Sequence, residues 1–256
     1  MNKILLSIVA IVLLATGCAS KKAEVKKEVR AHKVIHWGYV GDVSPIHWGD
    51  LKKEYFMCKE GKNQSPVDIT NTRYIEKKHI KFRYYIGGES VVYNGQAVQV
   101  DYKPGSFVTI DERRFELKQF HFHTPSENQI DGKSFPIEAH FVHVDYAGDI
   151  AVLALMIEEG EKNLELEKIL SVLSPKVGET KKLIYPANAS GLMPMDVDYY
   201  RYNGSLTTPP CSEGVLWAVF KKSVTASKEQ IQALQQTVRH PNNRPVQPIN
   251  ARLIAR

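Results

Sequence analysis

Polar and apolar residues alternate over several short stretches in the first half of the chain, a pattern typical of β-strands with one buried face. Turn signals such as Gly87-Gly88, Asn94-Gly95 and Pro104-Gly105 separate several of these stretches. The stretches that we expect to form strands are 80–86, 90–93, 97–102, 107–110 and 114–122.

Two later stretches, 150–157 and 215–219, are almost entirely apolar and predict strands that are buried on both faces of a sheet. Helical periodicity is limited to 163–173 and 227–238, and the second of these begins with Ser227 and Gln230 at capping-box spacing. The pattern therefore predicts a single, mainly β (α+β) domain with a large central sheet and a few peripheral helices.

The first 18 of the 256 residues differ from the rest of the chain. Lys3 precedes an apolar run that ends at Ala15, and Thr16-Gly17-Cys18 follows. A positive start, an apolar core too short to cross a bilayer comfortably, and small residues before a cysteine predict an export signal with a lipidated Cys18. An ordinary cleaved signal with an incidental cysteine is the alternative.

Residues 19–33 contain six basic and two acidic residues, and with Lys3 they account for most of the formal net charge of +6. We interpret this segment as a charged tether that can lie on an anionic membrane surface. The predicted domain, 34–256, is nearly neutral and gives no argument for nucleic-acid binding. We therefore expect an exported protein in the periplasm or at the cell surface, anchored to a membrane through Cys18.

Cys58 and Cys211 are the two cysteines of the predicted domain. An exported protein meets an oxidising compartment, which favours a disulfide between them. Such a bond would close a loop of about 150 residues and stabilise the fold by about 5 kcal/mol in the chain-entropy model. Two separate buried thiols are the alternative.

His121 and His123 alternate with Phe120 and Phe122 on one of the predicted strands. Side chains two residues apart on a strand share a face, so both imidazoles point the same way. They can supply half of a tetrahedral zinc site, and the stretch 137–143, which contains His140 and His143, is the obvious source of a third ligand on a neighbouring strand. Such a pair is also compatible with ordinary core or surface histidines, so the surrounding residues have to decide.

Four further features accompany the histidines, in an order and at a spacing that resemble the α-class carbonic anhydrases. The resemblance covers residues 34–256, and it rests on several separated motifs rather than on one. The features are Gln119, Glu127, Glu138 and the run Ser-Leu-Thr-Thr-Pro-Pro at 205–210.

The resemblance implies a mostly antiparallel, twisted sheet of about ten strands, and one zinc ion per chain. It places the three zinc ligands at His121, His123 and His140, with water in the open fourth position. Zinc lowers the pKa of that water towards neutrality, an effect for which carbonic anhydrases are the standard example. The implied activity is that of a carbonate dehydratase, in which zinc-bound hydroxide attacks CO2 and bicarbonate leaves.

The resemblance also assigns roles around the metal. Gln119 and Glu138 would orient the histidine rings by accepting a hydrogen bond from the nitrogen that does not bind zinc. Thr207 would accept a hydrogen bond from the hydroxide and donate its own to Glu127. The implied substrate pocket consists of Val142, Val152, Leu206, Thr208, Val215 and Trp217.

One position departs from the family pattern. Asn94-Gly95 is followed by Gln96, where the fastest members of the family have a histidine that carries the proton out. Glutamine does not titrate near neutral pH, so the step in question is proton export. Water and buffer are one alternative carrier, and another histidine such as His36 is a second. His143 falls on the opposite face to His140, and we interpret it as structural.

Two other functions share part of this pattern: a catalytically silent binding module on the same fold, and a surface lipoprotein that sequesters zinc. The intact histidines together with Glu127 and Thr207 favour the enzyme. The family further implies the Cys58–Cys211 disulfide, cis peptides at Ser65-Pro66 and Pro209-Pro210, and inhibition by sulfonamides and anions. The sequence is also compatible with a homodimer.

Overall fold

The computed structural model describes residues 36–76 and 79–256. The predicted export signal (1–18), with Cys18, and the predicted tether (19–33) lie outside the described residues. Ile35–Arg256 forms one compact unit. Within the described part of the chain, no helix is long and apolar enough to cross a membrane.

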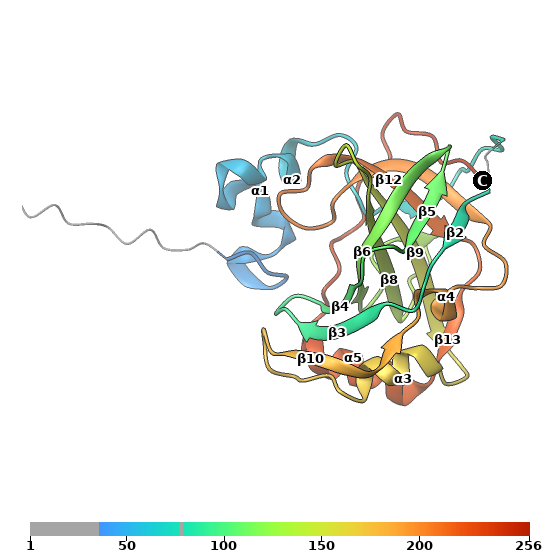
Figure 1. The fold of residues 1–256 in the computed structure, drawn as a ribbon. Coiled ribbons are helices and arrows are strands. Elements are labelled where there is room, and N and C mark those ends of the chain that lie inside the picture. The colour runs from blue at the N-terminus through green and yellow to red at the C-terminus, as the bar shows by residue number, and fades with distance from the viewer. Residues whose placement is uncertain (1–35, 77–78) are drawn as a thin grey trace, which may run out of the picture. The chain divides into compact units, whose positions relative to one another are not determined.

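An 11-stranded twisted sheet forms the centre of this unit (Figure 1). Its strands are β2 (Lys81–Arg83), β3 (Gly88–Tyr93), β4 (Val98–Tyr102), β5 (Phe107–Ile110), β6 (Arg113–His123), β8 (Ile137–Val144), β9 (Ile150–Glu159), β10 (Thr180–Ala187), β11 (Tyr199–Ser205), β12 (Glu213–Phe220) and β13 (Val224–Ala226). A separate parallel pair consists of β1 (Asp68–Ile69) and β7 (Gln129–Ile130).

The strand order is β10-β3-β4-β6-β8-β9-β12-β11, with β13 beside β9, and β5 joining β2 to β6. Within the described sheet the pairings are antiparallel except those of β9 with β12 and β13. The predicted mainly β, mostly antiparallel architecture is confirmed. The apolar stretch at 150–157 lies inside the sheet as β9 and is buried on both faces.

The expected strand at 80–86 is wrong in its second half. Only Lys81–Arg83 pairs with a neighbour, β5. Beyond it, side chains satisfy the backbone: the N–H of Tyr85 donates to the Ser106 hydroxyl, and its carbonyl accepts from the Tyr102 hydroxyl. Strands β10 and β11 were not expected. β10 is an edge strand whose side chains are mostly exposed, so it lacks the alternation that marks a half-buried strand.

Strand β6 contains a β-bulge that decides which way its histidines face. Its pairing with β8 changes register between Leu117 and Gln119, which leaves Lys118 as an extra residue. The extra residue reverses the alternation of the strand, so that His121 and His123 point away from the main apolar core. The side chains of β6 that do face this core, on either side of the bulge, are Phe115, Leu117, Phe120 and Phe122.

Two helices lie beside β10 at the lower edge of the view in Figure 1. They are α3 (Leu164–Leu170), which packs against β10, and α5 (Lys228–Val238), which packs against β4. Both predicted helices are confirmed, with shorter ends. The predicted capping box of Ser227 and Gln230 begins α5, and Ile231, Leu234 and Val238 of this helix are buried. A third short helix, α4 (Ala189–Leu192), follows β10.

Five short helices carry the chain from residue 41 to residue 60, outside the two stretches with helical periodicity. They are η1 (Gly41–Val43), η2 (Pro45–His47), α1 (Trp48–Leu51), η3 (Lys53–Tyr55) and α2 (Met57–Glu60). Trp48 is fully buried beneath them, and its indole N–H donates to the carbonyls of Gly38 and Val43 at 2.8 and 3.0 Å.

The predicted disulfide is confirmed. Cys58 and Cys211 form a disulfide, with their Cα atoms 5.0 Å apart, and pack with Trp48 and Tyr39 in a small apolar cluster. The predicted cis peptides at Ser65-Pro66 and Pro209-Pro210 are also present, together with one at Thr124-Pro125 that was not expected.

Candidate metal centre and active site

Three imidazoles meet on one face of the sheet, as the sequence pattern predicts. His121 and His123 project from β6, and His140 lies directly opposite His121 on β8. One ligand atom from each ring lies within 4.8 Å of the other two. His123 and His140 are buried and His121 is partly exposed, so the cluster is open to solvent on one side.

The protonation of these rings suits a metal. Burial lowers the pKa of all three imidazoles, and their mutual repulsion lowers the pKa of His121 and His140 further, so the neutral forms are favoured. Nε2 of His123 is buried without any hydrogen-bond partner. A neutral nitrogen that lacks a partner is what a metal ion would satisfy, and three histidines with an open position match catalytic zinc.

Acceptors orient the three rings. Nδ1 of His121 lies 2.9 Å from Oε1 of Gln119, as predicted. Nε2 of His140 lies 2.9 Å from Oε1 of Glu138, so the two atoms are in contact although they are not aligned as a hydrogen bond. Glu138 is itself fixed, because it accepts hydrogen bonds from the backbone N–H groups of Glu127 and Asn128 and from the Asn128 amide, all at 2.7 Å.

The sequence did not reveal the partner of His123. Nδ1 of this ring donates to the backbone carbonyl of Asn242 at 2.7 Å. The Asn242 side chain is locked in turn, since its oxygen accepts from the N–H of Thr124 and its amide donates to the carbonyls of Gln96 and Phe122. An acceptor therefore fixes the rings of His121 and His123, and Glu138 lies beside Nε2 of His140, so each ring keeps one nitrogen for a metal.

Glu127 lies against the cluster as a fully buried carboxylate. Its Oε2 is 3.4 Å from Nε2 of His123. Burial raises the pKa of Glu127 well above its usual range, whereas hydrogen bonds from the Arg244 N–H and the Thr207 side chain oppose that shift because they stabilise the ionised form. Thr207 is thus close enough to Glu127 to favour its ionised form, and the hydrogen-bond relay that the resemblance implied for this pair stays a prediction.

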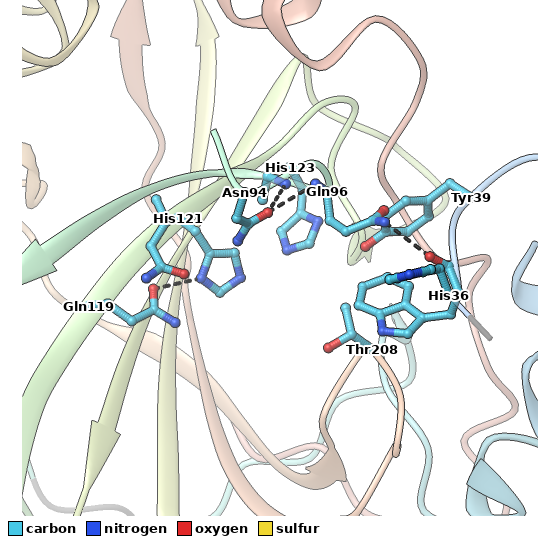
Figure 2. Close-up of a pocket in the computed structure, with 11 residues that line it drawn as sticks. His36, Tyr39, Asn94, Gln96, Gln119, His121, His123 and Thr208 are labelled. Atoms are coloured by element: carbon cyan, nitrogen blue, oxygen red, sulfur yellow. Dashed lines mark hydrogen bonds between the residues drawn. The ribbon is translucent and has the colours of Figure 1, made fainter. Parts of the chain in front are cut away.

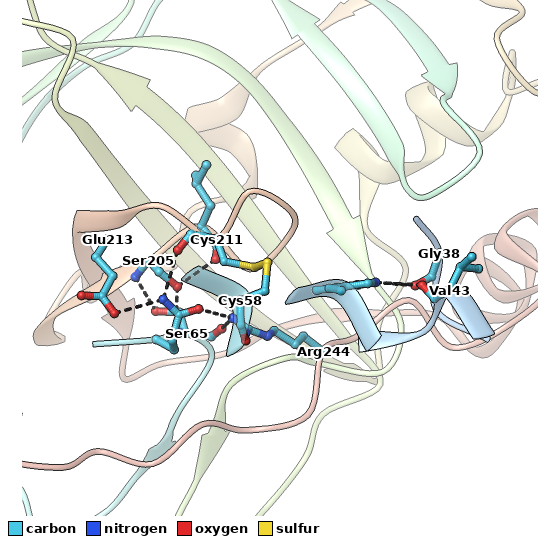
Figure 3. Close-up of a disulfide and its surroundings, with 11 residues drawn as sticks. Gly38, Val43, Cys58, Ser65, Ser205, Cys211, Glu213 and Arg244 are labelled. Carbon is cyan, nitrogen blue, oxygen red and sulfur yellow. Dashed lines mark hydrogen bonds between the residues drawn. A yellow bond between two sulfur atoms is a disulfide. The ribbon is translucent and has the colours of Figure 1, made fainter. Parts of the chain in front are cut away.

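Arg244 connects Glu127 to the disulfide, and Figure 3 shows its side chain beside Cys58. Its N–H donates to Oε1 of Glu127 at 2.8 Å, and its guanidinium, which is almost fully buried, donates to the side chain of Gln64 and the carbonyls of Ser65 and Cys58. Burial lowers the pKa of Arg244 to about 10, so it stays charged near neutral pH.

Backbone and side-chain contacts link Cys211, the other half of the disulfide, to the loop that carries Thr207 and Thr208. The Gln64 amide donates to the carbonyl of Cys211 at 3.0 Å, and the N–H of Cys211 donates to the carbonyl of Thr208 at 2.9 Å. The disulfide thus joins the loop that carries Thr207 to the segment that holds Glu127.

The apolar residues that the resemblance assigned to the substrate pocket lie together. Trp217 packs edge-on to the ring of His140, with centroids 4.9 Å apart, which places the cluster next to the metal ligands. These residues do not line the solvent-filled cavity described below, whereas Thr208 does. The members of the cluster are Val142, Val152, Leu206, Val215 and Trp217.

A cavity of about 410 Å³ opens in front of the histidines (Figure 2). Gln119, His121 and His123 form part of its wall, and Gln96 lies on the wall where the family pattern has a histidine. His36 and Trp37 complete the rim from the N-terminal segment. The site thus has a buried side, with Glu127 and Glu138, and a solvent-accessible side formed by the cavity.

Comparison with known proteins identifies the arrangement. The sequence model of eukaryotic-type carbonic anhydrase matches residues 43–256. The chain belongs to the α-carbonic anhydrase family. A carbonic anhydrase of Neisseria gonorrhoeae is 47% identical over 220 residues, which are 86% of this chain and 87% of that protein.

Two solved carbonic anhydrases share the fold. A hyperthermostable carbonic anhydrase identified from an active hydrothermal vent chimney is 53% identical, with a TM-score of 0.84 over 86% of this chain and 99% of that one. The α-carbonic anhydrase from Thermovibrio ammonificans, solved with the inhibitor sulfanilamide, is 46% identical, with a TM-score of 0.85 over 86% and 99% of the two chains.

This carbonic anhydrase is a lyase that catalyses the zinc-dependent, reversible hydration of CO2. His143 lies apart from that chemistry. It is fully buried on the opposite face of β8, between the Phe141 carbonyl and the Tyr84 hydroxyl, a position that fits the structural role expected for it.

Proposed function

We propose that His121, His123 and His140 hold one zinc ion per chain, each through one ring nitrogen. His121 and His123 would use Nε2, because Nδ1 of each ring already has an acceptor, and His140 would use Nδ1, because its Nε2 faces Glu138. When bound, zinc supplies the Lewis acidity that makes water available as a hydroxide nucleophile near neutral pH.

Thr207 orients the attacking oxygen in this proposal. Its hydroxyl would donate to Glu127, since Thr207 favours the ionised form of Glu127 and an ionised carboxylate can only accept a hydrogen bond. The threonine oxygen is therefore left to accept a hydrogen bond from the nucleophile, and this contact aims the lone pair of the nucleophile at the carbon of CO2. The N–H of Arg244 holds the carboxylate in place for this purpose. Glu127 and Thr207 act together with the metal, and neither binds it.

The apolar cluster beside His140 provides the binding surface for CO2. CO2 has no net dipole, so an apolar surface holds it without competing with water for hydrogen bonds. Val142 and Leu206 are the partly buried members of the cluster, and these two side chains are the ones that can contact substrate. Bicarbonate is charged, and it leaves through the wet cavity.

Sulfonamides and small anions should inhibit the enzyme. The support is the relative from Thermovibrio ammonificans, which was solved in complex with sulfanilamide. An anionic sulfonamide nitrogen would compete with water for the open position, while Thr207 and Thr208 supply polar contacts next to it.

We further propose that the protein is exported to the periplasm or cell surface and anchored to a membrane by lipid on Cys18. The short apolar run after Lys3, the small residues before Cys18 and the basic segment 19–33 support this. Cys18→Ser should release the protein from the membrane fraction of its host. A soluble native protein whose Cys18 carries no lipid would contradict the anchor.

The observation that carries the catalytic proposal is the convergence of three imidazoles, with ligand atoms within 4.8 Å of one another, beside Glu127. Stopped-flow CO2 hydration by zinc-analysed protein tests it, with a sulfonamide as the control. Hydration that requires zinc and is blocked by the sulfonamide supports the assignment. Full zinc content without hydration would instead indicate zinc sequestration, and a chain that takes up no zinc would indicate a binding module.

A further inference from the structure

Hydration of CO2 releases one proton per turnover, since CO2 and H2O give HCO3⁻ and H⁺. That proton has to leave through the cavity in front of the histidines. Neutral polar side chains dominate its wall and can hydrogen-bond water, but they do not titrate near neutral pH. They are Asn94, Gln96, Gln99, Gln119 and Thr208.

The cavity is also lined by four titratable side chains, and three of them are unsuitable carriers. His121 and His123 are committed to the metal. Tyr39 is buried, and burial with the nearby charge of Glu127 raises its pKa well above the usual range, so it keeps its proton. The fourth is the imidazole of His36, a side chain type that exchanges protons near neutral pH.

His36 stands where a carrier has to stand. It lines the same cavity as His121 and His123, yet it is exposed to solvent. Its ring therefore contacts the water of the cavity on one side and bulk buffer on the other. Figure 2 shows His36 at the rim, across the cavity from His121.

Gln96 ties this segment to the cavity wall. Its side-chain amide donates to the carbonyl of Trp37 at 3.0 Å, the residue after His36. Gln96 is itself fixed, because its N–H donates to Asn94 and its carbonyl accepts from the Asn242 amide. The Trp37 ring packs edge-on to Trp48 with centroids 5.3 Å apart, which anchors the other side of the segment.

We propose that His36 carries the proton out of the cavity and that Gln96 is the positioning residue that holds His36 at the rim. The proton leaves a water molecule in the cavity, passes along hydrogen-bonded water to a neutral ring nitrogen of His36, and then transfers to a buffer base outside. His36 is neutral again at the end of each turnover. Gln96 stands where the family pattern has a histidine. Instead of exchanging the proton itself, it positions a histidine that comes from the N-terminal segment.

His36→Ala tests the first half of the proposal. In dilute buffer we expect kcat to fall on the order of tenfold while kcat/KM is unchanged, because only proton export is slowed. Added imidazole should restore kcat. His47→Ala is the matched control, since His47 is exposed on η2 and does not line the cavity. An unchanged kcat in His36→Ala, or an equal loss in kcat/KM, would overturn the assignment.

Gln96→Ala tests the second half without relying on turnover alone. The ring resonances of His36, assigned by comparison with His36→Ala, should move in Gln96→Ala towards those of a histidine in an unfolded peptide. The same variant should show a reduced kcat in dilute buffer that imidazole restores. Unmoved resonances together with unchanged kcat would show that Gln96 does not position His36. A wild-type enzyme that does not hydrate CO2 at all would instead contradict the proposed function at zinc.

Discussion

The buried ring of His143 should make the stability of the enzyme depend on pH. Its Nδ1 lies 2.8 Å from the Phe141 carbonyl and must donate to it, so its Nε2 accepts from the Tyr84 hydroxyl at 2.6 Å. Burial disfavours a second proton on this ring, although the backbone groups of Phe141 and Ala151 favour the charged form. Burial accordingly lowers the pKa of His143 from 6.5 to about 4.

The size of the effect follows from that shift. Between the two pKa values the unfolded chain binds a proton that the folded chain does not, so the free energy of unfolding falls as the pH falls. The contribution is fully present above about pH 6.5 and is lost by about pH 4. The complete loss is about 3 kcal/mol, of which about 2 kcal/mol falls between about pH 7 and about pH 5.

Denaturant unfolding of zinc-loaded wild-type and His143→Asn enzyme at several pH values measures this difference. The variant is less stable overall, but its free energy of unfolding should fall by about 2 kcal/mol less over that range. Tyr84→Phe is the matched control, because it removes the hydroxyl and keeps the titrating ring. Protonation of the zinc ligands is common to all three proteins and cancels. Equal losses in wild type and His143→Asn would refute the reasoning.

Three further changes test other parts of the account. Thr207→Ala should lower kcat/KM on the order of 100-fold, whereas Thr207→Ser, which keeps the hydroxyl, should retain most of it; equal effects would exclude the hydroxyl as the cause. Replacing Cys58 and Cys211 by serine should lower the free energy of unfolding, measured in denaturant, by about 5 kcal/mol, because the disulfide closes a loop with a sequence separation of 153. An unchanged free energy of unfolding would show that the disulfide does not constrain the unfolded chain in this way. Deleting Lys118 should leave zinc binding intact, as should Lys118→Ala, because Leu117 then alternates regularly with Gln119 and the histidines stay on the face opposite the core. Loss of zinc in the deletion but not in Lys118→Ala would contradict the assignment of Lys118 as the extra residue.

The metal ligands could be predicted from the sequence because their geometry is local. Two histidines spaced by one residue on a strand share a face whatever the rest of the fold does, and His121 and His123 do so. The third ligand could not be predicted locally, because it depends on how β6 pairs with β8. The family resemblance identified His140, and the structure places His140 opposite His121. Gln119 was predictable for the same local reason, since it stands two positions before His121 on the same strand.

The bulge in β6 was missed, although the sequence contains its signal. Phe115 and Leu117 occupy odd positions, Phe120 and Phe122 occupy even ones, and all four face one core. A change of phase within one strand requires an extra residue. The prediction that the histidines oppose Phe120 and Phe122 was correct only locally, because in a regular strand that ran through Lys118 without a bulge Leu117 would lie on the histidine face.

Asn242 and Arg244 could not be found from residue type. Each acts on the site through a backbone atom, the carbonyl of Asn242 on His123 and the N–H of Arg244 on Glu127. Any residue has such atoms, so no side-chain pattern indicates the contact. The lipid anchor at Cys18 and the tether at 19–33 stay predictions, since they lie outside the described residues.

The central claim is that three histidines hold the catalytic zinc, and the most direct test is zinc content measured together with CO2 hydration for single alanine variants. We expect about one zinc per chain in the wild type and in the control His47→Ala. His121→Ala, His123→Ala and His140→Ala should each lose stoichiometric zinc and nearly all hydration while circular dichroism shows a folded sheet. A well-folded variant that keeps both full zinc and full activity would remove that histidine from the ligand set.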